Sequence, residues 1–310
     1  MNIYSSFVPD NFITVKYDDH TNFNDLNKDT SFSYKFFIDN VLLEDYSKLV
    51  KDYEGKNITY TKSNRCKLLD WIDKNKLDWG FLSSNKNAID LLEKNPKKIN
   101  WDYLSMNPNA IDLLKKNPKK IHWRLLSKNP NAIDLLKENP GKIDWFYLSM
   151  NPNAIDLLRD NTEKICWREL STNPNAIDLL KKNPEKIDWI SLSMNPNAIN
   201  LLKDNPEKIN WCYLSLNPNA IDLLRNNSEK INWNYLSENP NAIDMLKGNP
   251  INIYWDFLSK NLNAIDLLRD NPEKIDWDYL SENPNAIELL KENFDKIDWY
   301  WLSANPMIFD

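Results

Sequence analysis

The chain has 310 residues, which is enough for two or three ordinary domains with ample material for a core. Its 39 Lys and Arg residues are outnumbered by 45 Asp and Glu residues, and the net charge of −6 is spread along the sequence. A phosphate backbone attracts a concentrated basic face, and none is visible, so this composition disfavours nucleic acid as a partner.

The sequence carries no signal for membrane insertion or secretion. No apolar run approaches the roughly 18 residues that cross a bilayer, and the first residues lack the basic-then-apolar layout of a secretory signal. The three cysteines form no paired motif, which is typical of reduced thiols in a cytosolic compartment. We therefore expect a protein that is not secreted and has no membrane partner.

The N-terminal segment 1–78 does not follow the period that governs the rest of the chain. Its first part, 1–35, is mostly polar, and we expect an irregular segment there. The segment 36–53 keeps apolar side chains at helical spacing, and 63–79 resembles a degraded helix and turn. We predict that 36–78 form an N-terminal helical cap over the first repeat, since the apolar end of a solenoid needs a lid. An independent functional domain is the alternative.

Tryptophan then recurs at a constant interval without an insertion, at positions 79, 101, 123, 145, 167, 189, 211, 233, 255, 277 and 299. The spacing defines ten complete repeats over 79–298 and a truncated eleventh over 299–310. Numbered from its tryptophan, the repeat reads W-x-x-L-S-x-N-P-N-A-I-D-L-L-K-x-N-P-E-K-I-D. One such unit cannot bury its apolar groups alone, so neighbouring units must stack on one another.

Each repeat is predicted to contain two helices. Asp or Asn at position 22 is a cap for helix A, which begins at the next tryptophan. Asn-Pro at positions 7–8 starts helix B, and the second Asn-Pro at positions 17–18 ends it in a turn. We expect helix A to have about six residues and helix B about nine. With roughly 9–10 Å between packed helices, the repeats would form a rod on the order of 90–100 Å long.

The predicted fold class is therefore all-α, an α-solenoid of about ten 22-residue two-helix repeats with an N-terminal helical cap. The repeat resembles tandem 22-residue repeat proteins encoded by giant, mimivirus-like DNA viruses of amoebae and related protists. The resemblance rests on the motif LSxNPNAIDLLKxNPEKIDW, as at 281–299 with small departures, and covers residues 79–306. It implies a viral origin and an α-solenoid, and it transfers no catalytic residues.

The chain ends shortly after helix B of the eleventh repeat would begin. Met307, Ile308 and Phe309 are apolar, and we predict that 299–310 fold back over the last repeat as a C-terminal cap. The alternative is an apolar end face that docks on a second chain, which would give an end-to-end homo-oligomer.

Three regular columns of side chains have both a chemical and a structural interpretation. The tryptophans could stack bases, but they share the apolar face with Leu and Ile, so we interpret them as core. The Asp residues at position 12 could be paired acids or metal ligands. A Lys or Arg lies near each of them at helical spacing, so solvated ion pairs explain them better. The serines at position 5 have no histidine to activate them.

The sequence contains no phosphate-binding glycine loop and no zinc-ligand spacing. We therefore predict a protein that is not an enzyme, with no catalytic residues, no cofactor and no bound metal.

Positions 2 and 6 of helix A vary most between repeats and lie on its outward side, beside an often aromatic position 3. They are apolar in the middle of the array and charged towards its end, as at Asp256 and Lys260. Exposed apolar side chains in a row are typical of an interaction surface. The alternative is that curvature half-buries these positions. The predicted partner-binding residues are Phe146, Met150, Ile190, Met194, Cys212 and Leu216.

The leading hypothesis is a non-enzymatic repeat scaffold that binds another protein, viral or host, along its helix A surface. The rival is a structural virion component, packed among capsid or internal proteins. A third class, a helical repeat protein that binds nucleic acid, is disfavoured by the acidic balance. The expected location is the host cytoplasm or the virion.

Overall fold

The computed structural model describes residues 36–38, 41–43 and 66–310, and it divides the chain into two units, 1–64 and 65–310. In the first unit, strands β1 (Phe36–Ile38) and β2 (Val41–Leu43) form an antiparallel pair. The helix predicted over 36–53 is therefore wrong at these residues. Aromatic and β-branched side chains on either side of Asp39-Asn40 favour a hairpin. The remainder of 1–65 lies outside the described residues.

The second unit is an all-α solenoid, as predicted, in which a helix A begins at each repeat tryptophan and a helix B at each isoleucine of position 11. Helices A are α2 (Trp79–Ser84), α4 (Trp101–Met106), α6 (Trp123–Leu126), α8 (Trp145–Ser149), α10 (Trp167–Thr172), α12 (Trp189–Met194), α14 (Trp211–Leu214), α16 (Trp233–Glu238), α18 (Trp255–Lys260), α20 (Trp277–Glu282) and α22 (Trp299–Leu302). Helices B are α3 (Ile89–Glu93), α5 (Ile111–Lys116), α7 (Ile133–Lys137), α9 (Ile155–Arg159), α11 (Ile177–Lys181), α13 (Ile199–Lys203), α15 (Ile221–Arg225), α17 (Ile243–Lys247), α19 (Ile265–Arg269) and α21 (Ile287–Glu292).

Both Asn-Pro pairs of the repeat begin single turns of 3₁₀ helix. The first precedes helix B, as in η3 (Pro108–Ala110), so the start of the predicted helix B is wound more tightly than an α-helix. The second follows helix B, as in η4 (Pro118–Lys120), and leads to the next helix A. Proline suits both places because the first amide of a helical turn has no partner within that turn.

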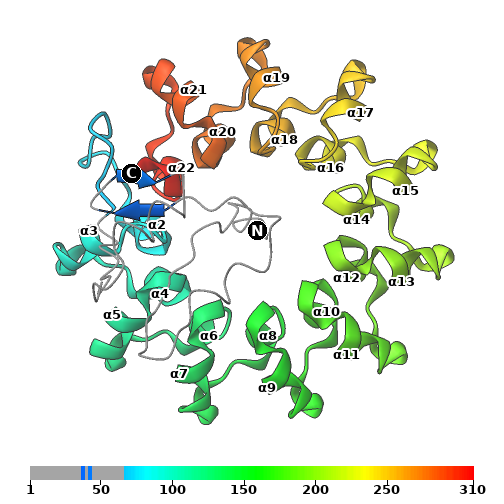
Figure 1. The fold of residues 1–310 in the computed structure, drawn as a ribbon, viewed down its shortest axis with the longest axis horizontal. Coiled ribbons are helices and arrows are strands. Elements are labelled where there is room, and N and C mark those ends of the chain that lie inside the picture. Colours follow the sequence, from blue (N-terminus) through cyan, green and yellow to red (C-terminus); the bar gives the residue numbers. More distant parts are fainter. Residues whose placement is uncertain (1–35, 39–40, 44–65) are drawn as a thin grey trace. The chain divides into compact units, whose positions relative to one another are not determined.

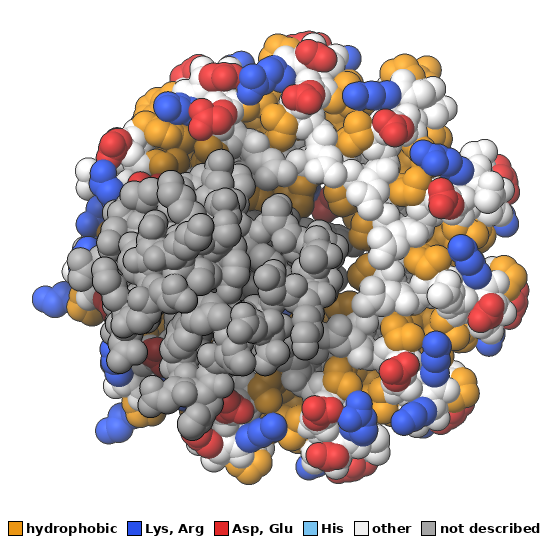
Figure 2. Space-filling model, in the orientation of Figure 1, with side chains coloured by type: hydrophobic (Ala, Val, Ile, Leu, Met, Phe, Trp, Pro, Cys, Tyr) orange, Lys and Arg blue, Asp and Glu red, His pale blue; other side chains and the backbone are white. Residues whose placement is uncertain are grey.

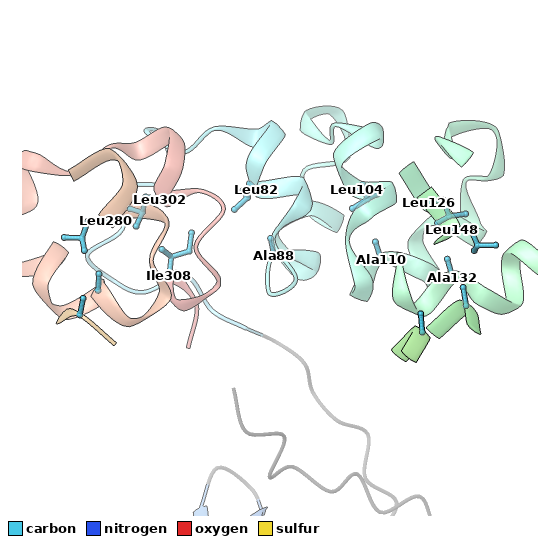
Figure 3. Packing of buried hydrophobic residues seen from close by; sticks show 14 of the residues in the cluster. Leu82, Ala88, Leu104, Ala110, Leu126, Ala132, Leu148, Leu280, Leu302 and Ile308 are labelled. Carbon is cyan, nitrogen blue, oxygen red and sulfur yellow. The ribbon is translucent and has the colours of Figure 1, made fainter. Parts of the chain in front are cut away.

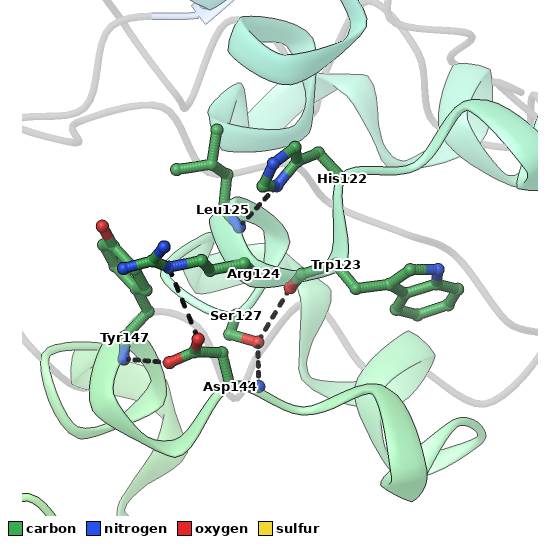
Figure 4. Close-up of polar contacts among 7 residues, drawn as sticks. All are labelled: His122, Trp123, Arg124, Leu125, Ser127, Asp144 and Tyr147. Carbon is green, nitrogen blue, oxygen red and sulfur yellow. Dashed lines mark hydrogen bonds and ion pairs between the residues drawn. The ribbon is translucent and has the colours of Figure 1, made fainter.

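The predicted caps of helix A are present. The side chain of Asn100 accepts hydrogen bonds from the amides of Asp102 and Tyr103. In the third repeat, Nδ1 of His122 takes the same role, accepting from the amide of Leu125 at 3.3 Å. Figure 4 shows this cap. Satisfying the free amides in this way favours a helix start at the tryptophan, although α10 and α18 begin there without a side-chain cap.

The core is a repeated layer of leucine and alanine. Leu at position 4, Ala at position 10 and Leu at position 14 are fully buried in nearly every repeat, and Ile at position 21 is mostly buried. The tryptophans pack against this core but are only half-buried. Their outer faces are covered by Lys of position 20, as where Lys98 Nζ lies 4.5 Å from the ring centroid of Trp79. The interpretation of tryptophan as core therefore holds for one face of each ring, and in most repeats a lysine covers the other.

The buried asparagine at position 7 joins each repeat to the one before it. Nδ2 of Asn107 donates to the carbonyls of Ser83 and Asn85, at 3.1 and 2.8 Å, while its Oδ1 accepts from the amide of Asn109 at 3.0 Å. Ser83 donates to the carbonyl of Trp79 and accepts from the amide of Asn100. These side chains are buried polar groups, and each must meet its hydrogen-bond partners on the neighbouring repeat. They therefore stabilise the interface between repeats and also set its register.

The same bonds join the end of the array to its beginning. Nδ2 of Asn85 donates to the carbonyls of Ser303 and Asn305, at 3.2 and 2.9 Å, as Asn107 does to the first repeat. Nδ2 of Asn87 donates to the carbonyl of Pro306 at 2.9 Å. In Figure 3, Leu302 and Ile308 lie on one side of this junction and Leu82 and Ala88 on the other. The first repeat therefore stacks on the eleventh, and residues 66–310 form a closed ring (Figure 1).

The eleventh repeat is assembled from both ends of this unit. The amide of Asp78 donates to Oγ of Ser303 at 2.8 Å, which is the bond that position 22 makes to position 5 inside every other repeat. Lys76 Nζ lies 4.8 Å from the ring centroid of Trp299, as position 20 does elsewhere. The two segments pair at Leu68 and Phe309. The segment 69–78 thus supplies positions 13–22 of the unit that begins at 299, and 69–310 make up eleven complete units.

Closure changes three expectations drawn from the sequence. The array is a ring with about 33° of turn per repeat, where a rod was predicted. Residues 66–78 contain no helix and complete the eleventh repeat, where a helical cap was predicted. Ile308 and Phe309, predicted to cap the last repeat, are buried at the junction with Leu68 and Leu69, so the alternative, an apolar end face for a second chain, is occupied by this chain.

Candidate functional site

The ring has an inner face made by helices A and an outer face made by helices B. Neighbouring helices A, such as α10 and α12, pack on one another, whereas neighbouring helices B pack less closely, and Figure 1 shows the helices B on the outside. Positions 4 and 5 of helix A are buried against the core. Positions 2, 3 and 6 lie on the opposite side of the helix, so they form what we call the inner face.

The six residues predicted to bind a partner lie on this inner face. Phe146 and Ile190 are the most accessible of them, with 43% and 52% of their surface exposed. Met150, Met194, Cys212 and Leu216 are half-buried. The pairs on α12 and α14 are neighbours, but α10 separates them from the pair on α8.

A basic sector overlaps this apolar one. Arg124 on α6 lies 3.5 Å from the carboxylate of Asp144 and 5.1 Å from the ring centroid of Tyr147 (Figure 4). Burial lowers the pKa of the Lys128 ammonium, and the nearby Glu169 carboxylate opposes that shift. Arg168 is exposed on α10. The inner face from the third to the fifth repeat therefore combines cations with apolar side chains.

The opposite sector of the inner face is aromatic. Position 3 is aromatic in seven consecutive repeats when the ring is followed through its closure, and several of these rings touch. Tyr213 stacks on Tyr235 with centroids 5.8 Å apart, and Tyr235 meets Phe257 edge-on at 6.2 Å. The seven residues are Tyr213, Tyr235, Phe257, Tyr279, Trp301, Phe81 and Tyr103.

The closure itself is part of this aromatic row. The ring of Phe81, from the first repeat, lies 5.5 Å from Trp301 and 4.3 Å from Tyr300 of the eleventh, and 5.5 Å from Tyr103 of the second. The variation between repeats indicated that position 3 is often aromatic. It did not show that the row continues through Trp301 and Phe81, because these residues lie at opposite ends of the array in the sequence.

Carboxylates accompany the aromatic row. Asp256 and Asp278 are exposed at position 2, beside half-buried Glu238 and Glu282 at position 6. Burial raises the pKa of the Asp278 carboxyl, and the nearby carboxylates of Asp298 and Asp276 raise it further. Like charges disfavour one another's ionisation, so this raised pKa indicates that negative charge is concentrated in this sector.

The sector already holds one cation. Nζ of Lys260 lies 3.8 Å from the ring centroid of Tyr279 and 5.7 Å from that of Phe257. An ammonium placed over two neighbouring rings shows that their faces are oriented to receive positive charge.

The outer face carries the Asp column of position 12. Two of the predicted ion pairs within one helical turn are formed, Asp156 with Arg159 at 2.7 Å and Asp222 with Arg225 at 3.6 Å. Their side chains are mostly exposed, so each pair contributes little to stability. Figure 2 shows charged side chains of both signs around the outer circumference.

The side chains that could in principle act as nucleophiles or metal ligands have structural roles in this fold. Each Ser of position 5 is buried and bonded to the tryptophan carbonyl of its own helix, as for Ser127 and Trp123 at 2.9 Å (Figure 4). Within 66–310, no three His, Cys, Asp or Glu side chains are grouped so as to hold a metal ion. No helix among the described residues is long and apolar enough to cross a membrane.

Comparison with known proteins gives no relative: no protein-family model, no curated protein and no solved structure matches the chain.

Proposed function

We propose that the ring is a non-enzymatic scaffold that binds another protein through the apolar sector of its inner face. The observation that carries the proposal is the exposure of Phe146 and Ile190, large apolar side chains at position 2 of helix A, which is polar or charged in most of the other repeats. Leaving such side chains in water is unfavourable, and covering them with a partner removes that cost.

The half-buried neighbours support this interpretation. Met150 and Met194 lie one helical turn from Phe146 and Ile190 on α8 and α12. Methionine adapts its shape to a partner because its side chain is unbranched and flexible. Arg124, on α6 beside the sector, and Arg168, on α10 within it, would give it a preference for partners that combine acidic and apolar residues.

The resemblance of the repeat to those of giant DNA viruses supports a viral origin, and so a partner from the virus or from its host. We place the protein in the host cytoplasm or the virion on the same ground.

The test is a pull-down from infected cells with the full chain and a triple variant, Met150→Glu, Met194→Glu and Leu216→Glu. We expect the variant to keep its circular dichroism spectrum and to lose partners that the wild type retains. The control carries three new glutamates on helices B, Lys137→Glu, Lys181→Glu and Lys203→Glu, which change the net charge more than the first variant does, and it should retain these partners. Identical partners for the wild type and the first variant, with both folded, would remove this surface from consideration.

A structural component of the virion is the second candidate, and the closed ring favours it. Every repeat interface within 66–310 is made, including the last, which suits a rigid building block. Mass spectrometry of purified particles tests it: the chain should be abundant there, and its absence would eliminate the idea. Reading of nucleic acid is not proposed, because carboxylates interrupt any basic track along the inner face.

A further inference from the structure

The aromatic sector of the inner face differs in chemistry from the apolar sector and is not used by the proposed function. We propose that it binds a basic polypeptide segment, with Arg or Lys side chains seated on the aromatic rows and paired with the carboxylates beside them. The surface concerned runs through α14, α16, α18 and α20 and continues across the ring closure to α22, α2 and α4.

The first argument is charge complementarity. Asp256, Asp278, Glu238 and Glu282 lie on the neighbouring helices α16, α18 and α20, and Lys260 is the cation at these positions. Besides burial, the nearby carboxylates of Asp298 and Asp276 raise the pKa of Asp278, so a further negative charge is unfavourable at this place. A segment that brings positive charge to this sector relieves the repulsion and gains attraction at each contact.

The second argument is the position of Lys260. Its ammonium lies over Tyr279 and near Phe257, so the chain itself shows how a cation occupies two adjacent rings. The equivalent position in the flanking repeats is Glu238 or Glu282, so the neighbouring rings have no lysine from position 6. A partner's Arg or Lys placed over Tyr235 and Phe257 would repeat the arrangement, with Glu238, which is the equivalent of Lys260 for this pair of rings, close by.

The third argument is spacing. The ring centroids of Tyr213, Tyr235 and Phe257 follow one another at 5.8 and 6.2 Å. Side chains two residues apart on an extended strand are separated by about 6.5–7 Å on the same face. An extended segment with cations at alternate residues therefore places one cation at each repeat.

Affinity for a defined probe tests the proposal. The probe is a fluorescein-labelled peptide of alternating Arg and Ser, long enough to cross the aromatic row, titrated with the full chain at low salt and followed by fluorescence anisotropy. We expect saturable binding that weakens as salt is added, because the contacts are partly between exposed charges. A peptide of alternating Glu and Ser should not bind.

Paired variants distinguish binding at this surface from a nonspecific attraction of the basic peptide to an acidic protein. Asp256→Asn with Asp278→Asn should weaken binding by about fivefold, since two exposed ion pairs are lost. Asp244→Asn with Asp266→Asn removes the same charge from the outer face and should leave the affinity unchanged. Equal weakening by the two pairs would overturn the proposal, because the peptide would then respond only to net charge.

The lysine gives the sharpest comparison. Lys260→Met frees the rings of Tyr279 and Phe257 and should strengthen binding by roughly three- to fivefold. Lys247→Met, on the outer side of α17, makes the same change in net charge and should not. Tyr235→Leu should weaken binding about threefold with the circular dichroism spectrum retained. Unaltered affinity in both Lys260→Met and Tyr235→Leu would exclude the aromatic row as the binding surface.

These outcomes are independent of the proposed scaffold function. The variants at Met150 and Met194 lie outside the aromatic sector, whereas Leu216 belongs to the repeat of Tyr213, so the peptide titrations use variants that keep Leu216, and either surface can fail its test while the other passes.

Discussion

Ring closure depends on a few residues at the end of the chain, and Ile308 is the one whose removal is most informative. Its side chain is fully buried at the junction, next to the hydrogen bond between its carbonyl and the amide of Leu69 at 2.9 Å. The adjacent Met307 has 43% of its surface exposed. The variant Ile308→Ala therefore removes buried contacts from the junction, and Met307→Ala is its matched control.

The expected magnitude follows from burial. Truncating a fully buried isoleucine to alanine costs about 2–5 kcal/mol, because contacts are lost and a cavity remains. In a repeat array each interface contributes separately, so this cost falls on the one interface between the eleventh and first repeats. A loss of about 2 kcal/mol makes opening of that junction roughly 30-fold more frequent. Met307→Ala should change stability by less than about 0.5 kcal/mol.

Hydrogen exchange measures this opening with an internal reference. The amide of Asp78 donates to Ser303 Oγ across the junction at 2.8 Å, and the amide of Asp188 makes the equivalent bond to Ser171 Oγ at 3.1 Å in the middle of the array. In Ile308→Ala, exchange at Asp78 and Leu69 should rise by an order of magnitude or more while exchange at Asp188 stays unchanged. Equal acceleration at Asp78 and Asp188, or none at either, would refute a separately closing junction.

Two further predictions concern the repeats themselves. Asn195→Ala removes the bonds to the buried carbonyls of Ser171 and Asn173, at 3.0 and 2.8 Å, of which the second still accepts from the amide of Ala176, and should lower the free energy of unfolding by about 2–4 kcal/mol in urea titrations. The exposed Asn197 makes one such bond, so Asn197→Ala should cost about 1 kcal/mol or less; equal costs would contradict the role given to the buried ladder. The raised pKa of Asp278 means that its carboxyl ionises less readily in the folded than in the unfolded chain, so it lowers stability as the pH rises above the ordinary value of 3.8. Asp278→Asn should raise the melting temperature slightly at pH 7 and leave it unchanged at pH 3, and a loss of stability at pH 7 would show the sign to be wrong.

Much of this fold is predictable from one sequence because each repeat contains its own signals. Asp or Asn before tryptophan caps helix A, and Asn-Pro begins each 3₁₀ turn, as at Asn107. Both are local effects that act in the same way in every unit. The half-exposed state of the tryptophans was missed. In most repeats the lysine that covers the ring stands near the far end of the repeat, as Lys98 does for Trp79, beyond the reach of helical periodicity.

Closure could not be predicted from the period alone. The turn per repeat depends on how closely helices A and B of adjacent units approach, and a pattern of apolar positions does not specify this packing. One signal was present in the sequence: Lys76, Leu77 and Asp78 match positions 20–22 of the repeat, although no tryptophan precedes them at the right distance. The helix predicted over 36–53 failed at the described residues because Ile38 and Leu42 keep helical spacing, while Phe36, Phe37 and Val41 beside them are residue types that favour strands.

The candidate surfaces likewise divide into features that one repeat reveals and features that depend on contacts between distant parts of the chain. Variation at positions 2 and 6 led to Phe146 and Ile190, because exposed apolar residues can be recognised once the buried positions of a repeat are known. The continuous aromatic row could not be recognised, since Trp301 and Phe81 are neighbours only in the closed ring.

The distance between the two ends of the array tests the central claim most directly. Spin labels are attached to Lys86→Cys in the first repeat and Met307→Cys in the eleventh, with Cys66, Cys166 and Cys212 replaced by serine, and the distance is measured by pulsed electron resonance. In the ring these repeats are neighbours, as the bond from Asn87 to Pro306 at 2.9 Å requires, so the labels should lie within roughly 25 Å of one another. A distance on the order of 90 Å, as in an open rod of eleven stacked repeats, would contradict closure.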